Sequence, residues 1–270
     1  MTVAIVIPAT DYRPHCISLL DRLCKSIVRG GTSTSPETEI VICMDGCSTD
    51  FVEFFQDTYP DFTYLIHKGN RRNFCANSNM GLRYAHSKGM SAILCNQDTV
   101  LPDWKYLGWL QAAGQGLTST QSVEESDQDK LNTLNQVQEP AYTSVLNDSV
   151  PANKFAGYCY YIDLAVMEEI GFLHEPFGAS FDEDLYITKA LLAGFPVQIS
   201  NIKVYHEGTH IDQAALGGQS LTGAYGGDLL QMNHHKYRYM WQIPPEVQHP
   251  QYVKWILSRF TWSKEEMYDP

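Results

Sequence analysis

The chain has 270 residues, 44% of them hydrophobic, and a formal net charge of -12. A chain of this length can bury a sizeable core, whereas its negative charge argues against binding to nucleic acid and to anionic membrane surfaces. No apolar run approaches the roughly 18 residues of a membrane span, and no secretory signal is recognisable. The seven cysteines lack the paired spacing of a zinc site. We therefore expect a soluble cytoplasmic protein without a transmembrane segment, whose thiols are reduced.

Short apolar runs and amphipathic stretches alternate through the first hundred residues. The apolar runs predict strands over residues 3–7, 39–44, 62–66 and 92–95. One helix is expected after Pro14 and a second after Ser48 or Asp50, either of which can cap it, and a third is expected over 77–87. Strands that alternate with helices of this length indicate βαβ units and a mostly parallel sheet.

The second half of the chain opens with a polar segment. Residues 114–153 are rich in Gln, Ser, Thr, Asn and acidic residues and poor in aromatics, so we expect a flexible loop or a lid there. Order returns over 155–162. The pattern then predicts helices over 164–170 and 185–193, each stopped by a glycine, and a strand over 197–205 that ends in His206. A glycine-rich loop over 217–227 and a helix over 228–241 follow.

Polar side chains follow several of the predicted strands. The run 92–95 stops at Asn96-Gln97-Asp98, Asp45 and His206 follow other strands, and the triplet Asp182-Glu183-Asp184 opens a helix. Ligands of open α/β folds bind at the carboxyl edge of the sheet, and a carboxylate beside a second oxygen ligand can hold a divalent cation that grips phosphate. Each residue also has a structural explanation, as a turn residue, a helix-start charge or a core histidine. Their joint placement favours a binding site.

Basic residues gather at one place in this acidic chain. Lys68, Arg71 and Arg72 follow the third predicted strand. Such side chains suit the binding of phosphate, and a solvated loop is the alternative explanation.

The motifs, taken in order, resemble those of GT-A fold glycosyltransferases of the family 2 type, including the rhamnosyltransferase-like branch. The resemblance covers roughly residues 3–241. It rests on these segments: Ile7-Pro8-Ala9-Thr10, Met44 to Asp50, Asn73-Phe74 with Asn79-Met80-Gly81, Asn96-Gln97-Asp98-Thr99, Phe181 to Lys189 with Ala193-Gly194-Phe195, Val204-Tyr205-His206, and Asn233, Tyr237 and Trp241.

This resemblance implies an α/β fold, a Rossmann-like, doubly wound mixed sheet in a single GT-A domain over residues 1–270. Residues 1–100 would form the nucleotide-sugar half. Residues 101–241 would form the acceptor half, with the polar loop 114–153, and 242–270 would be a C-terminal extension.

The resemblance also implies roles for individual residues. Asp98 and His206 would hold Mn²⁺ or Mg²⁺, with Asn96 close by or acting through water. The donor would contact Pro8, Thr10, Asp45, Arg72, Asn79 and Gln97. The acidic triplet would supply the general base, which is Glu183 in an ungapped alignment with Ala193-Gly194 and Asp184 with a one-residue gap. In two departures, Gly46 replaces the second Asp of the base-binding element, and Asn96 removes one charge from the metal motif.

The implied reaction is metal-dependent transfer of a sugar from a nucleotide-diphosphate sugar to a hydroxyl of a glycan or another acceptor. An available base implies inversion. Asp45 favours UDP or dTDP, because the imide N–H of uracil or thymine can donate to a carboxylate. Two alternatives stay open: an inert nucleotide-sugar-binding protein, and a sugar nucleotidyltransferase, although residues 7–14 lack the glycine that a triphosphate loop needs. The protein would be cytoplasmic, or peripheral to a membrane through its acceptor.

Overall fold

The computed structural model describes residues 2–11, 15–32, 37–69, 73–136, 138–146, 155–178, 181–207 and 229–264. In this part of the chain, nine strands form one mixed sheet in the order β3-β2-β1-β4-β8-β6-β9-β5, and β7 pairs with β9. The strands are β1 (Val3–Ala9), β2 (Thr38–Asp45), β3 (Thr63–His67), β4 (Ser91–Cys95), β5 (Thr99–Val100), β6 (Leu117–Val123), β7 (Tyr142–Ser144), β8 (Cys159–Ile162) and β9 (Val197–His206). The helices are α1 (Cys16–Arg29), α2 (Thr49–Thr58), α3 (Phe74–Ser87), α4 (Trp104–Leu107), α5 (Trp109–Ala112), α6 (Leu131–Gln136), α7 (Leu164–Ile170), α8 (Asp182–Leu192), α11 (Leu229–Met240) and α12 (Tyr252–Leu257). Short 3₁₀ turns are η2 (Glu125–Lys130), η4 (Glu175–Phe177) and η5 (His249–Gln251).

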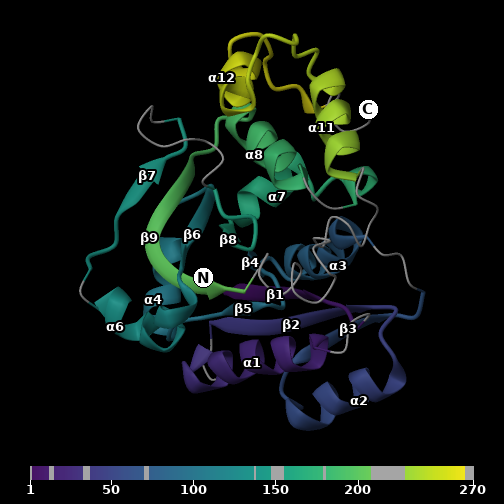
Figure 1. The fold of residues 1–270 in the computed structure, drawn as a ribbon, viewed down its shortest axis with the longest axis vertical. Helices are drawn as coiled ribbons and strands as arrows, with labels where there is room; N and C mark the ends of the chain where they lie inside the picture. The colour runs from purple at the N-terminus through teal and green to yellow at the C-terminus, as the bar shows by residue number, and fades with distance from the viewer. Residues whose placement is uncertain are drawn as a thin grey trace.

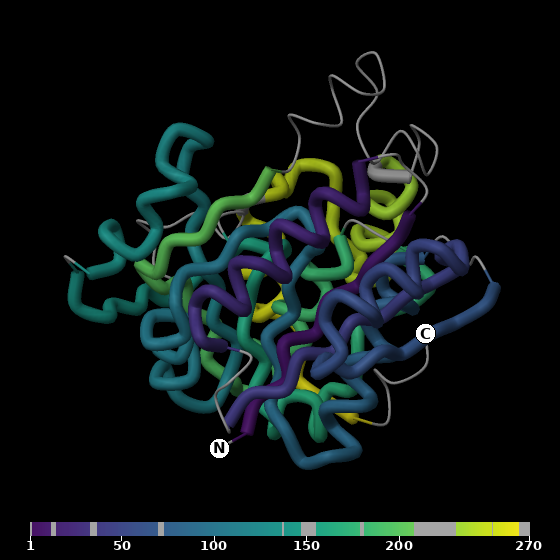
Figure 2. The backbone as a smooth tube through the Cα atoms, turned by 90° about the horizontal axis from the view of Figure 1, so that it is seen from below, coloured from purple at the N-terminus to yellow at the C-terminus, as the bar shows by residue number. Residues whose placement is uncertain are grey.

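Helices cover both faces of the sheet. In Figure 1, α1 and α2 lie on one side, and α3, α7 and α8 on the other. Figure 2, the view from below, shows α1 and α2 crossing in front of the strands. This arrangement confirms the doubly wound mixed sheet, and it explains why β1 is apolar at every position, since a parallel strand between two helical layers has no solvent face.

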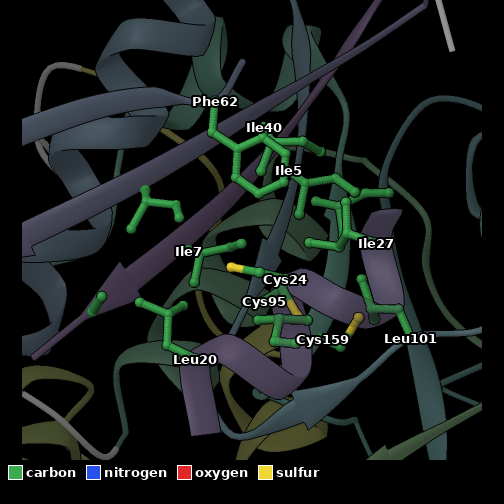
Figure 3. Close-up of a cluster of buried hydrophobic side chains, with 14 of the residues drawn as sticks. Ile5, Ile7, Leu20, Cys24, Ile27, Ile40, Phe62, Cys95, Leu101 and Cys159 are labelled. Carbon is green, nitrogen blue, oxygen red and sulfur yellow. The ribbon is translucent and has the colours of Figure 1, made fainter. Parts of the chain in front are cut away.

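Alternate side chains of β1 enter two different cores. Ile5 and Ile7 face Leu20 of α1 in the core drawn in Figure 3, and Ala4 and Val6 belong to the core beneath α3, α7 and α8. Close helix packing on the second face depends on Gly81 of α3. A Cβ at Gly81 would lie 2.3 Å from Val6 Cγ1 and 2.8 Å from Cys43 Sγ, so only glycine lets the helix lie this close to β1 and β2.

The expectation of a flexible loop or lid over 114–153 is wrong for most of that segment. β6 lies inside the sheet, antiparallel to β8 and parallel to β9, and η2, α6 and β7 follow it. Polar side chains misled the prediction, because several of them are buried in the sheet and hydrogen-bonded there. Thr120 donates to the Cys159 carbonyl, and Ser200 of β9 donates to the Ser119 carbonyl. Residues 137 and 147–153 lie outside the described residues.

Several other predictions about elements are confirmed. α7 spans the predicted 164–170, and Gly171 ends it with φ 76°, a value that glycine adopts without strain. The helix of the acidic triplet ends before Gly194, and β9 ends at His206. All seven cysteines are thiols. The predicted loop over 217–227 lies outside the described residues, and within those that are described no helix is long and apolar enough to cross a membrane.

The C-terminal segment packs on α8 rather than on the sheet. Side chains on and around α8, α11 and α12 form a third apolar cluster, which includes the rings of Phe181, Tyr237, Trp241 and Tyr252. Figure 1 shows α11 and α12 together at the end of α8, away from the strands. Residues 243–260 are therefore a packed part of the structure around α8.

One edge of the sheet collects the polar residues singled out in the sequence. β1, β2, β3 and β4 are parallel, and β6 and β9 run in the same direction across the antiparallel β8. The carboxyl ends of these strands, and the start of β8, therefore meet at one edge. This edge is where open α/β sheets bind their ligands.

Candidate active site

The pairing of β5 with β9 brings the two predicted metal ligands together. Thr99 lies opposite His206 in this antiparallel pair, and the Glu207 N–H donates to the Asp98 carbonyl at 3.0 Å. Asp98 therefore lies beside the end of β9, and its Oδ1 is 3.3 Å from His206 Nε2. Both side chains are largely but not fully buried, which leaves them accessible at the sheet edge. The prediction that these two residues meet is confirmed.

A tyrosine that the sequence analysis missed orients the histidine. The ring of Tyr158 lies 4.2 Å from the His206 imidazole with an interplanar angle of 11°, a stacked arrangement. The Tyr158 carbonyl also accepts a hydrogen bond from the Asn96 N–H at 2.8 Å, continuing the β4–β8 ladder by one residue. Tyr158 thus joins the metal motif to His206. Its position inside the segment 155–162, where order was predicted to return, was the only available signal.

Several buried polar atoms near this edge lack hydrogen-bond partners within the described residues. Among them are Asn96 Oδ1, Asn77 Oδ1 and the Tyr160 hydroxyl. Asn77 lies at the end of β1, because its Nδ2 donates to the Ala9 carbonyl. Unsatisfied buried polar atoms are costly, so their presence at one edge is typical of a site whose ligand or ordered water supplies the missing partners.

The loop after β1 is tied to the loop after β4. The Thr10 N–H donates to Gln97 Oε1 at 2.7 Å, which brings together two residues predicted to contact the donor. Asp11 accepts a hydrogen bond from the Ser48 N–H at 2.6 Å, linking the same loop to the start of α2. Pro8 is buried within β1, one residue before the strand ends. The two hydrogen bonds tie together the loops that follow β1, β2 and β4.

Asp45 is held by a histidine from the neighbouring strand. The two lie opposite each other in the β2–β3 register, and Asp45 Oδ1 is 2.8 Å from His67 Nδ1. The Asp45 side chain is 2% exposed and that of His67 is 41% exposed, so the histidine covers the carboxylate. His67 was missed in the sequence because its role depends on strand register, which no local motif encodes.

Two further donor-contact predictions have different outcomes. Asn79 is fully buried, and its amide is satisfied by Leu173 N–H and C=O and by Glu175 Oε1. It therefore ties α3 to the segment before η4 and has a structural role here. Arg71 and Arg72 lie outside the described residues, and Lys68 is exposed after β3.

The two candidate bases occupy different surroundings. Successive residues of a helix point about 100° apart, since there are 3.6 residues in a turn. A Cβ on Gly157 would lie 3.2 Å from the Glu183 carboxyl, which places Glu183 next to Tyr158 at the sheet edge. Asp184 instead lies 3.8 Å from His249 Nε2, on the side of the C-terminal segment. Of the two alternative alignments, this geometry favours Glu183.

The surroundings of Glu183 favour its neutral form. Burial, followed by the charges of Asp182 and Asp184, raises the pKa of Glu183 well above the usual carboxyl range. Asp182 is itself buried, with 4% of its surface exposed. A carboxyl group whose pKa is raised in this way can accept a proton near neutral pH, which an ordinary surface carboxylate does poorly.

The residue before the triplet has an unusual backbone. Phe181 is in the left-handed region with φ 63°, at the position that precedes α8. Such a conformation costs energy in a bulky residue and is retained where surrounding contacts impose it. Here the Phe181 ring packs against His234 at 5.3 Å, His249 at 5.4 Å and Tyr237 at 5.7 Å. Rings of the C-terminal segment therefore fix the start of the helix that carries the acidic triplet.

Comparison with known proteins reveals structural matches only. No family model and no curated protein matches the chain. The mannosyltransferase PcManGT from Pyrobaculum calidifontis, in complex with GDP-Man and Mn²⁺, matches with a TM-score of 0.58 and 16% identity over 98% of this chain and 69% of its own. TarS of S. aureus matches with a TM-score of 0.57 and 12% identity over 96% of this chain, which spans only 43% of TarS.

A shorter form, TarS 1-349 in complex with UDP, matches with a TM-score of 0.54 and 11% identity over 94% of this chain and 78% of that one. At such low identities a structural match establishes the fold rather than the activity. The structural match extends over both halves of the chain, because each match covers more than nine-tenths of it. The chain has the GT-A glycosyltransferase fold.

Proposed function

We propose that this protein transfers a sugar from a nucleotide-diphosphate sugar to an acceptor hydroxyl. The observation that carries the proposal is the meeting of Asp98 and His206 at 3.3 Å on the sheet edge that also holds Glu183. Matched GT-A structures that contain GDP-Man, UDP or UDP-GlcNAc support a donor of this class. We infer inversion because a base is available on the acceptor side.

The residues at the edge fit a divalent cation. They offer one carboxylate, one imidazole and the buried Asn96 Oδ1, which has no partner within the described residues. Among those residues no group of three or more His, Cys, Asp and Glu could hold a metal, so donor phosphate oxygens or water would complete the coordination. Such a set, rich in oxygen ligands, suits Mn²⁺ or Mg²⁺. When bound, the cation would neutralise charge on the diphosphate leaving group.

The chain's own groups account for the remaining steps. Glu183 would accept the proton of the acceptor hydroxyl as that oxygen attacks the anomeric carbon. Thr10, Gln97 and Asp45 would bind the nucleotide. The exposed His67 ring that covers Asp45 would turn aside so that the carboxylate could accept the imide N–H of uracil or thymine, and we therefore propose UDP or dTDP as the nucleotide of the donor.

The experiment is a calorimetric titration of UDP, dTDP, GDP and ADP, each with and without Mn²⁺, into the protein and into Asp98→Ala. The wild-type protein should bind UDP or dTDP most tightly and only in the presence of Mn²⁺, and Asp98→Ala should lose the metal-dependent part. Asp57→Ala, which removes an exposed carboxylate from the last turn of α2, is the matched control and should behave as wild type. Unchanged metal-dependent affinity in Asp98→Ala would contradict the metal site, and a preference for ADP would contradict the role of Asp45.

A further inference from the structure

We propose that His249 is a positioning residue for this reaction: by pairing with Asp184 it keeps that carboxylate on the C-terminal side of α8 and leaves Glu183 as the base at the sheet edge. The inference rests on the proposed function, since it concerns the base of that reaction. The C-terminal segment would then contribute to the reaction by holding Asp184 through His249.

The first argument is the position of His249 itself. Its Nε2 lies 3.8 Å from Asp184 Oδ1, within the range of an ion pair. The imidazole is only half-buried, yet it is enclosed on two sides by edge-to-face contacts, with the Phe181 ring at 5.4 Å and the Tyr252 ring at 5.2 Å. The histidine is therefore held in one place by aromatic rings from two elements.

The second argument is what surrounds the pair. Asp184 faces His249 from α8, His234 faces it from α11 with the ring centroids 6.3 Å apart, and Tyr252 faces it from α12. His234 is bound to the Tyr252 hydroxyl at 2.7 Å, and the guanidinium of Arg238 lies over the Tyr252 ring. Burial lowers the pKa of His234, and His234 is therefore neutral more readily than His249. His249 is the group best placed to offset the Asp184 charge.

The third argument is electrostatic. The neighbouring Asp184 carboxylate raises the pKa of His249, despite an opposing effect of burial. The charge of Asp184 is in turn one of the causes that raise the pKa of Glu183. A protonated His249 beside Asp184 therefore moderates the negative field at Glu183. Without it, Glu183 should hold its proton to a higher pH, so a smaller fraction of the protein would carry the ionised, proton-accepting form at neutral pH.

The groups around Glu183 do not compensate for such a loss. Its helix contributes Asp182 and Asp184, α3 contributes Cys75, and β8 contributes Tyr160. Burial, and then the neighbouring carboxylates, raise the pKa of the Cys75 thiol and of the Tyr160 hydroxyl, so both stay neutral. His249, whose Nε2 lies 3.8 Å from Asp184, is therefore placed to bring positive charge to the triplet.

The test is an NMR titration of carboxyl carbons in the full chain, with Glu183 assigned by comparison with Glu183→Gln. In His249→Gln the titration midpoint of Glu183 should move to higher pH, and His249→Lys, which restores a cation, should move it back. His235→Gln removes an exposed histidine from α11 and is the matched control, in which the midpoint should not move. In Asp184→Asn the midpoint should fall, and adding His249→Gln to that variant should have no further effect.

An unmoved Glu183 midpoint in His249→Gln, or an equal shift in His235→Gln, would overturn the proposal. Should His249→Gln fail to fold, an unchanged midpoint in Asp184→Asn would overturn it equally. The acid limb of UDP-sugar hydrolysis against pH is the second readout and should follow the NMR midpoint. If the midpoint shifts while no nucleotide sugar is ever consumed, the pairing stands and the proposed function fails. If nucleotide sugar is consumed while the midpoint stays unmoved, the proposed function stands and the role of His249 fails.

Discussion

At the scale of single residues, two neighbouring carboxylates differ because of what each one faces. Glu183 lies beside Gly157, is buried, and has other carboxylates as neighbours. Asp184 lies beside His249. The sequence alone presents them as equivalent members of an acidic triplet. Their separation depends on which side of α8 packs on the sheet and which packs on the C-terminal segment, and that information is not local.

Removing the charge of Glu183 should abolish activity and increase stability. Its pKa is raised in the folded protein, so its ionisation costs stability as pH rises from the ordinary carboxyl range through the raised value. Glu183→Gln stays neutral and escapes this cost. We expect transfer or donor hydrolysis to fall by at least about 100-fold, and the melting temperature to exceed that of wild type increasingly as pH rises from about 4 to about 8.

Thermal melts across this pH range, together with a rate assay, check both halves of the prediction. Glu53→Gln, which makes the same change at an exposed position of α2, is the matched control. It should show no stability gain that grows with pH. A stability difference for Glu183→Gln that is the same at all pH values would contradict the environment described for Glu183.

For metal affinity, the ring of Tyr158, which stacks on His206, should matter more than the Tyr158 hydroxyl. Tyr158→Leu removes the ring that lies 4.2 Å from the imidazole, whereas Tyr158→Phe retains it. Groups that orient metal ligands typically contribute 10–100-fold to metal affinity, so we expect about a tenfold or greater loss of Mn²⁺ affinity in the leucine variant and near-wild-type affinity in the phenylalanine variant. Calorimetry with Mn²⁺ in the presence of UDP measures both, and equal affinities in the two variants would refute the stacking role.

At the scale of elements, local patterns located most helices and strands, while partners and register came from the whole sheet. Hydrophobic periodicity and the glycines that end helices predicted α7, α8 and β9. β6 does not, since its polar side chains hide a strand that runs through the sheet. The pairing of Thr99 with His206 likewise joins residues more than a hundred positions apart.

The contact of α3 with the sheet should tolerate no side chain at Gly81. A methyl group there would meet Val6 Cγ1 at 2.3 Å and Cys43 Sγ at 2.8 Å, so the helix or the strands would have to move. Overpacking of this kind costs about 1–3 kcal/mol, which should outweigh the better helix propensity of alanine. Urea unfolding of Gly81→Ala measures the loss, and Ser87→Ala, on an exposed position of α3, should be close to neutral. A Gly81→Ala variant as stable as wild type would show that the packing can relax.

At the scale of the whole molecule, the fold and much of the edge were predictable from the sequence. The motifs come at the ends of strands, and parallel strands bring their ends together, so Asp98 and His206 could be expected to meet. His67, Tyr158 and His249 could not be found in the same way, since each acts on a motif residue from a different element. The C-terminal segment, expected as an extension, supplies the rings that fix the start of α8.

The burial of the cysteines has a practical consequence for labelling this protein. Six of the seven thiols are buried, and burial, followed by the charges of Asp11 and Asp45, raises the pKa of the half-buried Cys47 to about 12. Alkylating reagents attack the thiolate, so the native protein should incorporate almost no iodoacetamide at neutral pH, as intact-mass spectrometry would show, and urea should expose all seven thiols. Tyr239→Cys, at a position 88% exposed on α11, would then carry a single fluorophore beside the C-terminal segment without removal of any native cysteine.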